Sequence, residues 1–258
     1  MGRVRLQRLD DYQSWLFEVQ GRRIAVDPWL TASHRLPPGH WLFGRRRQAP
    51  TPGPEAIASV DAVILTGPFA DHCDPDTLGV LPRTVPIFAQ GIAAKRATQL
   101  GFTRVTAMRG GDEATPFPGT KLRAVQPGFP YRHNSIGFVI EGDGARAGFE
   151  THVIDLPRHG KQLEGLDLLV VPVQGVWLMG VPFVMAPEKV RRIVDALKPR
   201  QVVVTGNDPE KGHGLLSSAM LFYRGSVAEF AASMAPSTSR FVDLNAGQTL
   251  DVGAQAST

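Results

Sequence analysis

The chain has 258 residues, of which 43% are hydrophobic and 20% charged, and this composition excludes a disordered protein. Its net charge of +4 is too small to predict a nucleic-acid partner. The single cysteine, Cys73, excludes an intramolecular disulfide and a Cys-rich structural zinc site. No apolar run is long enough to cross a bilayer, and no apolar segment follows the basic N-terminus as in a secretory signal. These features favour a cytoplasmic protein with no membrane partner.

The first third of the chain has the alternation of apolar and polar residues that is typical of β-strands. Strands are expected over residues 4–8, 15–19 and 23–26. Asp27-Pro28 ends the third strand, because proline cannot donate to a sheet ladder. A Pro/Gly-rich loop is expected over residues 34–54, and its cluster Arg45–Arg47 is either a solvated loop or an anion-binding lip. Asp61–Leu65 is nearly all apolar, which indicates a strand buried on both faces.

Strands and helices alternate through the rest of the chain. Asp74 is expected to cap a helix that begins at Pro75. Further strands are expected over 85–89, 105–108, 121–125, 135–140, 145–149, 166–173 and 201–204, with helices over 91–100, 187–197 and 227–234. Residues 240–252 are expected to form a closing strand or hairpin, and 254–258 a free tail. Two β-rich halves that each carry helices predict an α/β fold, an αββα sandwich of two mixed sheets, as one domain over residues 1–258.

The strongest local feature is the loop that follows the buried strand and precedes a helix. Such a loop is where α/β sheets place functional groups. It contains Asp71 and His72, and a carboxylate beside an imidazole can ligate a metal or orient a catalytic base. Glu150 and His152 lie two residues apart at the end of another predicted strand. Because alternate residues of a strand face the same side, we expect these two to point together toward Asp71 and His72.

The order of strands and the loop Thr66–His72 resemble the metallo-β-lactamase fold, whose members carry Thr-His-x-His-x-Asp-His at this place. Trp15–Leu30 is similar to the opening hairpin of that family, and Val171–Gly180 to a late strand and loop of its lactonase-like branch. Gly67 and Phe69 stand where the family has the two histidines of His-x-His. The chain therefore resembles a divergent cyanobacterial and plant group that lacks this pair but keeps Asp-His and Glu-x-His.

The resemblance implies that the first metal site of the family is lost. Phe149-Glu150-Thr151 matches the family's Gly-Asp-Thr, and Thr205-Gly206-Asn207 stands where its last histidine lies. What remains implies at most one divalent ion, most readily zinc, with the ligands Asp71, His72, Glu150 and His152. Whether a further residue joins this site stays open, the candidates being His133, His213 and Cys73. The histidines expected to lie outside it are His34, His40 and His159.

Two functions are compatible with these residues. The first is a metal-dependent hydrolase of a small-molecule ester, lactone or phosphoester, with Asp71 and His72 as catalytic residues and a metal-bound water of lowered pKa. The alternative is a metal-free, non-catalytic protein that binds a small ligand or a partner in the same cleft. RNA binding through Arg45–Arg47 is disfavoured, because that loop lacks the interleaved aromatic residues on which bases stack.

Overall fold

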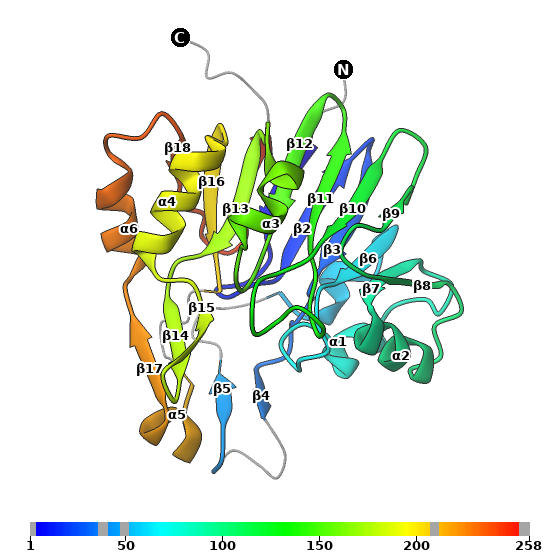
Figure 1. Cartoon of the computed structure of the whole chain (residues 1–258). Coiled ribbons are helices and arrows are strands. Elements are labelled where there is room, and N and C mark those ends of the chain that lie inside the picture. The colour runs from blue at the N-terminus through cyan, green and yellow to red at the C-terminus, as the bar shows by residue number, and fades with distance from the viewer. Residues whose placement is uncertain (1–3, 36–40, 47–51, 207–211, 253–258) are drawn as a thin grey trace.

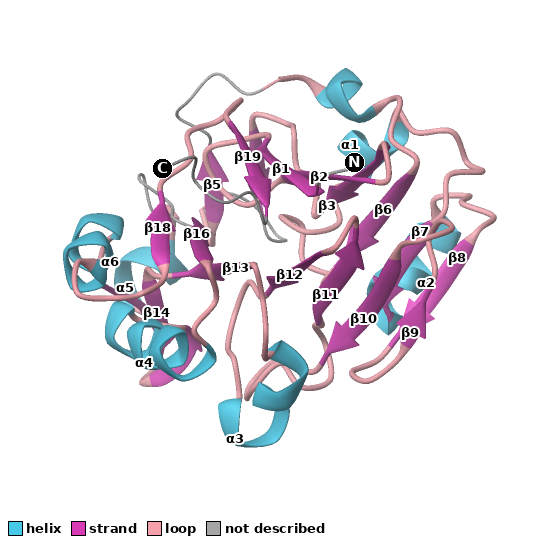
Figure 2. Ribbon diagram, turned by 90° about the horizontal axis from the view of Figure 1, so that it is seen from above, coloured by secondary structure: helices cyan, strands magenta, loops and turns pink. Residues whose placement is uncertain are grey.

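The computed structural model describes residues 4–35, 41–46, 52–206 and 212–252. Two seven-stranded sheets face one another, with helices on their outer faces (Figures 1 and 2). The expected αββα sandwich is therefore confirmed. The predicted tail 254–258, and residues 36–40 and 47–51 of the predicted loop, lie outside the described residues.

The first sheet has the strand order β19-β1-β2-β3-β6-β7-β8. Its strands are β1 (Val4–Arg8), β2 (Trp15–Val19), β3 (Arg22–Val26), β6 (Ala62–Leu65), β7 (Ile87–Gln90), β8 (Val105–Met108) and β19 (Thr249–Val252). The neighbours β3 and β6 are parallel, so their carboxyl ends meet at one edge of the sheet. Asp27 and Thr66 follow these two strands directly, and this edge carries the candidate site.

The second sheet has the order β18-β16-β13-β12-β11-β10-β9. Its strands are β9 (Glu113–Ala114), β10 (Lys121–Val125), β11 (Gly137–Gly142), β12 (Ala145–Phe149), β13 (Leu168–Pro172), β16 (Gln201–Thr205) and β18 (Arg240–Val242). The neighbouring strands β12, β13, β16 and β18 all run parallel to one another, so the carboxyl ends of β12 and β16 lie at the same edge of the sheet. The side chains of Trp15 and Thr205 join the two sheets there by a 2.8 Å hydrogen bond from the indole Nε1 to the threonine hydroxyl.

Helices cover the outer faces of the two sheets and pack on them through stripes of apolar side chains. The helices are α1 (Pro75–Gly79), α2 (Gly91–Gln99), α3 (Leu156–His159), α4 (Pro187–Leu197), α5 (Leu215–Ala219) and α6 (Val227–Met234), with the 3-10 turns η1 (Pro54–Ile57) and η2 (Gly160–Leu163). Helix α4 buries Val190, Ile193, Val194 and Leu197 against the second sheet, which is the helical spacing seen in the sequence. Asp74 caps α1 as expected, since its carboxylate accepts from the Thr77 main-chain N–H.

Smaller elements cover the edge at which β3 and β6 end. A three-stranded sheet contains β14 (Gly175–Leu178), β15 (Val181–Val184) and β17 (Leu221–Arg224), and a hairpin contains β4 (Ser33–Arg35) and β5 (Gly44–Arg46). In Figure 1 these elements and α5 lie together below the two large sheets. Two main-chain hydrogen bonds between Gly44 and His213, of 2.9 and 2.8 Å, join the hairpin to the segment that carries α5.

Two expectations about the chain's course are wrong. Residues 240–252 form no single strand or hairpin, because β18 pairs with β16 in the second sheet and β19 with β1 in the first. Part of the predicted loop 34–54 is ordered as strands β4 and β5. Within the residues that the structure describes, none of the helices has both the length and the apolar character that a membrane span needs.

Candidate functional site

His72 is held at its Nδ1 atom by the carboxylate of Asp27, which was not predicted to belong to the site. Its Nδ1 lies 2.8 Å from Oδ2 of Asp27, which is fully buried. Thr66 donates to both oxygens of that carboxylate, from its hydroxyl at 2.5 Å and from its main-chain N–H at 2.7 Å. Because Asp27 accepts, we assign the proton of neutral His72 to Nδ1, which leaves Nε2 as the nitrogen with the lone pair.

The surroundings of His72 favour its charged form. Burial by itself disfavours an imidazolium, but the carboxylates of Asp27 and Asp71 outweigh burial and raise the pKa of His72 above its ordinary value. His72 therefore keeps its positive charge, and a proton on Nε2, to a higher pH than an exposed histidine does.

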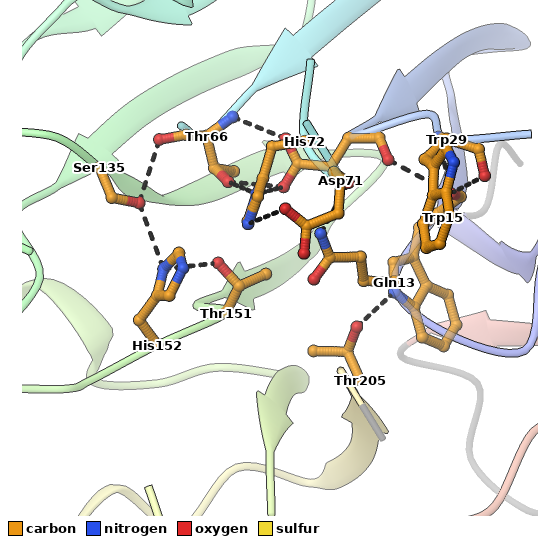
Figure 3. Close-up of polar contacts among 12 residues, drawn as sticks. Gln13, Trp15, Trp29, Thr66, Asp71, His72, Ser135, Thr151, His152 and Thr205 are labelled. Carbon is orange, nitrogen blue, oxygen red and sulfur yellow. Dashed lines mark hydrogen bonds and ion pairs between the residues drawn. The ribbon is translucent and has the colours of Figure 1, made fainter. Parts of the chain in front are cut away.

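Asp71 lies beside the other nitrogen of this imidazole, as Figure 3 shows. Its Oδ1 is 4.0 Å from Nε2 of His72, and its Oδ2 is 3.3 Å from Nη1 of Arg45. Gln13 fixes the backbone by a 2.7 Å hydrogen bond from its side-chain amide to the Asp71 carbonyl. Arg45 also donates to the Tyr12 hydroxyl at 2.7 Å, and only 9% of the residue is exposed. At Arg45 the solvated-loop interpretation is therefore wrong, because the guanidinium is ion-paired within the fold.

His152 is held by hydroxyl groups instead of a carboxylate. Its Nδ1 lies 3.0 Å from Thr151 Oγ1 and 3.3 Å from Ser135 Oγ (Figure 3). The Ser135 hydroxyl donates its hydrogen to the Thr66 carbonyl, so it accepts from the imidazole, and we assign the His152 proton to Nδ1. Burial, and then the proximity of His72, lower the pKa of His152 well below its ordinary value. His152 is therefore neutral.

An aromatic cluster surrounds these two imidazoles. The Phe69 ring meets His72, His152 and Tyr131 edge-on, with centroid distances of 5.5, 5.8 and 5.9 Å. Tyr131 stacks on His152 at 3.8 Å. His72 and His152 themselves stack at 5.1 Å with 20° between their ring planes. Phe69 thus occupies, with its ring, the space beside both histidines.

Glu150 lies next to His152, and its Oε1 is 3.9 Å from Nδ1 of His152. Strand β12 ends at Phe149, so the alternation from which a shared direction was expected does not extend to these two residues, and their common orientation toward Asp71 and His72 stays a prediction. The Glu150 carboxylate accepts from the main-chain N–H of His152 at 2.9 Å, and it is absent from the cavity wall to which His152 contributes. Burial raises the pKa of Glu150 to about 8.

The side chains as they lie do not fit the single ion that the resemblance implied. An ion bound by a histidine lies close to the plane of its ring, and two stacked, nearly parallel rings such as His72 and His152 share no such point near both. One oxygen of Asp71 already faces the guanidinium of Arg45. In the described ranges no group of three or more His, Cys, Asp and Glu side chains is arranged to hold a metal ion. The set Asp71, His72, Glu150 and His152 stays a prediction.

The site opens into a cavity of about 250 Å³. Its described lining includes the side chains of Arg45, Asp71, His72 and His152, and its apolar wall includes Phe69, Phe183 and Leu216. The charges compensate in pairs, Arg45 with Asp71 and His72 with Asp27. The cavity therefore presents acid–base groups in an apolar, overall neutral enclosure.

The other candidate histidines do not line this cavity. His133 borders a separate hollow beside α2, where its carbonyl accepts from the Gln90 side chain at 2.9 Å. His213 lies in the strand-like bridge to Gly44, and His159 ends α3. His40 and the side chain of His34 lie outside the described part of the chain.

Cys73 is buried and is expected to be unreactive. Its residue is 4% exposed, and burial raises the pKa of the thiol to about 11. The thiolate is the reactive species, so the folded protein should not react with a disulfide reagent at pH 8. In denaturant the same reagent should titrate one thiol per chain. Rapid reaction of the folded protein would contradict this assignment, and Cys73 would again be a candidate member of the site.

Comparison with known proteins places these features in a family. The fold is similar to isothiocyanate hydrolase from Delia radicum gut bacteria, with a TM-score of 0.73, 18% identity and coverage of 97% of this chain and 100% of that one. It is also similar to Igni18, a metallo hydrolase from Ignicoccus hospitalis, with a TM-score of 0.68, 19% identity and coverage of 98% and 99%. No curated protein sequence matches the chain. A sequence model described as the beta-lactamase superfamily domain matches residues 9–205, and the chain belongs to that family.

Proposed function

We propose that the protein hydrolyses a small, neutral ester or lactone in this cavity by acid–base catalysis from His72 and His152. The observation that carries the proposal is that two imidazoles border one cavity in surroundings of opposite effect. A buried carboxylate, Asp27, favours the charged form of His72, whereas burial and the proximity of His72 keep His152 neutral, with only the uncharged hydroxyls of Ser135 and Thr151 as partners. Titratable groups driven apart in this way supply an acid and a base at the same pH.

The reaction then needs only these two side chains and water. Neutral His152 accepts a proton from a water molecule, whose oxygen attacks the carbonyl carbon. The imidazolium of His72 donates a hydrogen bond to the oxyanion that forms. When the carbonyl is restored and the C–O bond to the leaving group breaks, His72 gives its proton to the leaving alkoxide. The products are a carboxylic acid and an alcohol, which for a lactone are parts of one molecule. Before the next turnover, His152 releases its proton to water and His72 takes one up from water, which restores both imidazoles.

The dimensions and charge of the cavity support this substrate class. A volume of about 250 Å³ is below that of most ligand pockets, so the substrate is compact. Because the charges of Arg45 and His72 are already compensated by Asp71 and Asp27, a neutral molecule is favoured over a phosphoester anion. The single zinc ion implied by the resemblance is the competing version of this proposal, and it involves Asp71 and His72 as well.

The test is turnover of chromogenic esters, lactones and phosphoesters by protein treated with a chelator and assayed for residual metal. Replacing His72 or His152 with asparagine is expected to lower kcat/KM for the preferred ester or lactone by about 10²-fold or more, the usual contribution of a general acid or base. His159→Asn is the matched control, because His159 lies in α3 outside the cavity wall, and its rate should be unchanged.

Three results would contradict the proposal. One is the absence of turnover on every ester and lactone, and another is full activity in both His72→Asn and His152→Asn. The third is activity that the chelator removes and zinc restores, which would favour the metal-dependent version. Saturable binding of these molecules without turnover would favour the alternative, a non-catalytic ligand-binding protein.

A further inference from the structure

The carboxylate of Asp71 is paired with a cationic side chain, the guanidinium of Arg45. Nη1 of Arg45 lies 3.3 Å from Asp71 Oδ2, and the two side chains are only 11% and 15% exposed. Taking two charges out of water costs several kcal/mol for each ion unless the partners compensate one another. Because the pair is this well buried, each charge is stabilised by the other.

Arg45 is held in place independently of Asp71. Its guanidinium lies 4.4 Å above the Tyr12 ring, donates to the Tyr12 hydroxyl at 2.7 Å, and lies 5.7 Å from the Phe43 ring centroid. The backbone beside it is fixed by the two hydrogen bonds between Gly44 and His213. A side chain fixed from both its backbone and its tip is a built part of the cavity wall.

The space where the resemblance would put metal ligands is filled by other groups. Gly67 offers no side chain, and the Phe69 ring packs against both His72 and His152. Among the described residues that line the cavity, Arg45 is the one lysine or arginine. The positive charge that a metal ion would place beside Asp71 is thus supplied by a guanidinium.

We propose that Arg45 is a positioning residue that takes the electrostatic place of a metal ion at Asp71, so that this site is complete without one. Arg45 fixes the side chain of Asp71. Oδ1 of Asp71 in turn lies 4.0 Å from Nε2 of His72, so the carboxylate charge acts on this imidazole. The inference concerns the cavity of the proposed function, but it is tested by folding and metal content, so it can fail or hold whether or not the protein hydrolyses esters.

The experiment is a double-mutant cycle on the full-length protein, read by thermal unfolding. Arg45→Gln removes the guanidinium beside the Asp71 carboxylate, and Asp71→Asn removes the charge that this guanidinium faces. Each is expected to lower Tm by about 3 °C or more. In the Arg45→Gln background, Asp71→Asn is expected to lower Tm by less than it does in the wild type, because the ion pair that it breaks is already gone. Where Arg45→Gln does not fold, Arg45→Lys takes its place in the cycle.

The control is a second pair of similar length outside the cavity. Arg5 and Asp251 are 3.2 Å apart and their side chains are 50% and 36% exposed, so Arg5→Gln and Asp251→Asn should each change Tm little, and their effects should add. Arg45→Lys keeps the charge and should recover part of the Tm lost in Arg45→Gln, which mere loss of packing would not predict.

Metal content completes the test. We expect wild-type protein to contain far less than one zinc, iron or manganese ion per chain by mass spectrometry, and added zinc to leave its Tm unchanged. Two outcomes would overturn the proposal. One is a wild-type content of about one metal ion per chain that is lost in Asp71→Asn or His72→Asn. The other is a double variant whose decrease in Tm equals the sum of the decreases in the two single variants.

Discussion

Replacing Asp27 with alanine is expected to lower the free energy of unfolding by about 3–5 kcal/mol, the cost of removing one partner from a buried charged network. Its carboxylate accepts from the Thr66 hydroxyl and main-chain N–H and from His72 Nδ1, at 2.5, 2.7 and 2.8 Å. Alanine would remove the acceptor that these three buried groups share and open a small void, and only the Thr66 hydroxyl and His72 Nδ1, which are 2.8 Å apart, could then pair with each other. Urea-induced unfolding measures the loss directly. Asp195→Ala is the control, because that carboxylate is 52% exposed, and its replacement should cost less than about 1 kcal/mol.

The amide variant Asp27→Asn separates stability from chemistry. Its shape is conserved, and its oxygen can still accept from Thr66, but it supplies no charge to stabilise the His72 imidazolium. We expect a smaller loss of stability, a lowered His72 pKa in an NMR titration, and a rate on the preferred ester reduced by about 10³–10⁴-fold, as when the acidic partner of a catalytic histidine is removed. An unchanged His72 pKa in Asp27→Asn would show that Asp27 does not control this imidazole.

Local sequence signals predicted those features that depend on neighbouring residues. Asp74 before Pro75 predicted a helix cap, and the structure shows that cap, because capping involves residues three positions apart. The buried strand before Thr66 was also predicted correctly, since a run of apolar residues suffices to indicate a strand with both faces covered. The αββα arrangement followed from the order of such elements, together with the family resemblance.

Features that join distant segments were missed. Arg45 and Asp71 are 26 residues apart, and the ion pair depends on where strand β5 lies relative to the loop that follows β6. Tyr131, which stacks on His152, carried no signal in the sequence. Asp27 did carry one: it directly follows a strand, as does Thr66, and the ends of neighbouring parallel strands meet. The position of an acidic residue at such an end would have indicated a partner for His72.

Period-two reasoning does not extend to Glu150, because a strand's alternation ends where the strand ends. Strand β12 stops at Phe149, and the next residues turn, so Glu150 uses its carboxylate to accept from the main-chain N–H of His152. The consequence is a buried acid that is neutral around pH 7. In a site of this family such an acid would have been expected to be an ionised metal ligand. These two roles of Glu150 predict opposite effects of one substitution.

Glu150→Gln is expected to stabilise the protein increasingly as the pH rises from 5 to 8. The carboxyl has a pKa of about 8 when folded, because burial raises it, against the ordinary value of 4.5. Between those values the folded state binds more protons than the unfolded chain, so wild-type stability falls with rising pH, by at most about 1.4 kcal/mol per pH unit. Glutamine does not titrate, and its oxygen can still accept from the His152 N–H. The difference between variant and wild type isolates this contribution, since the other groups titrate in both.

Chemical unfolding at pH 5, 6, 7, 8 and 9 measures this difference. It should increase from pH 5 and level off above about pH 8, where the folded wild-type carboxyl is itself ionised. Glu188→Gln is the matched control, because Glu188 is exposed and its difference should stay small at every pH. If Glu150 instead served as an ionised ligand, Glu150→Gln would destabilise the protein at neutral pH and lower its metal content. A difference that does not depend on pH would show that Glu150 has an ordinary pKa in the folded protein, and that its burial is compensated by a charge.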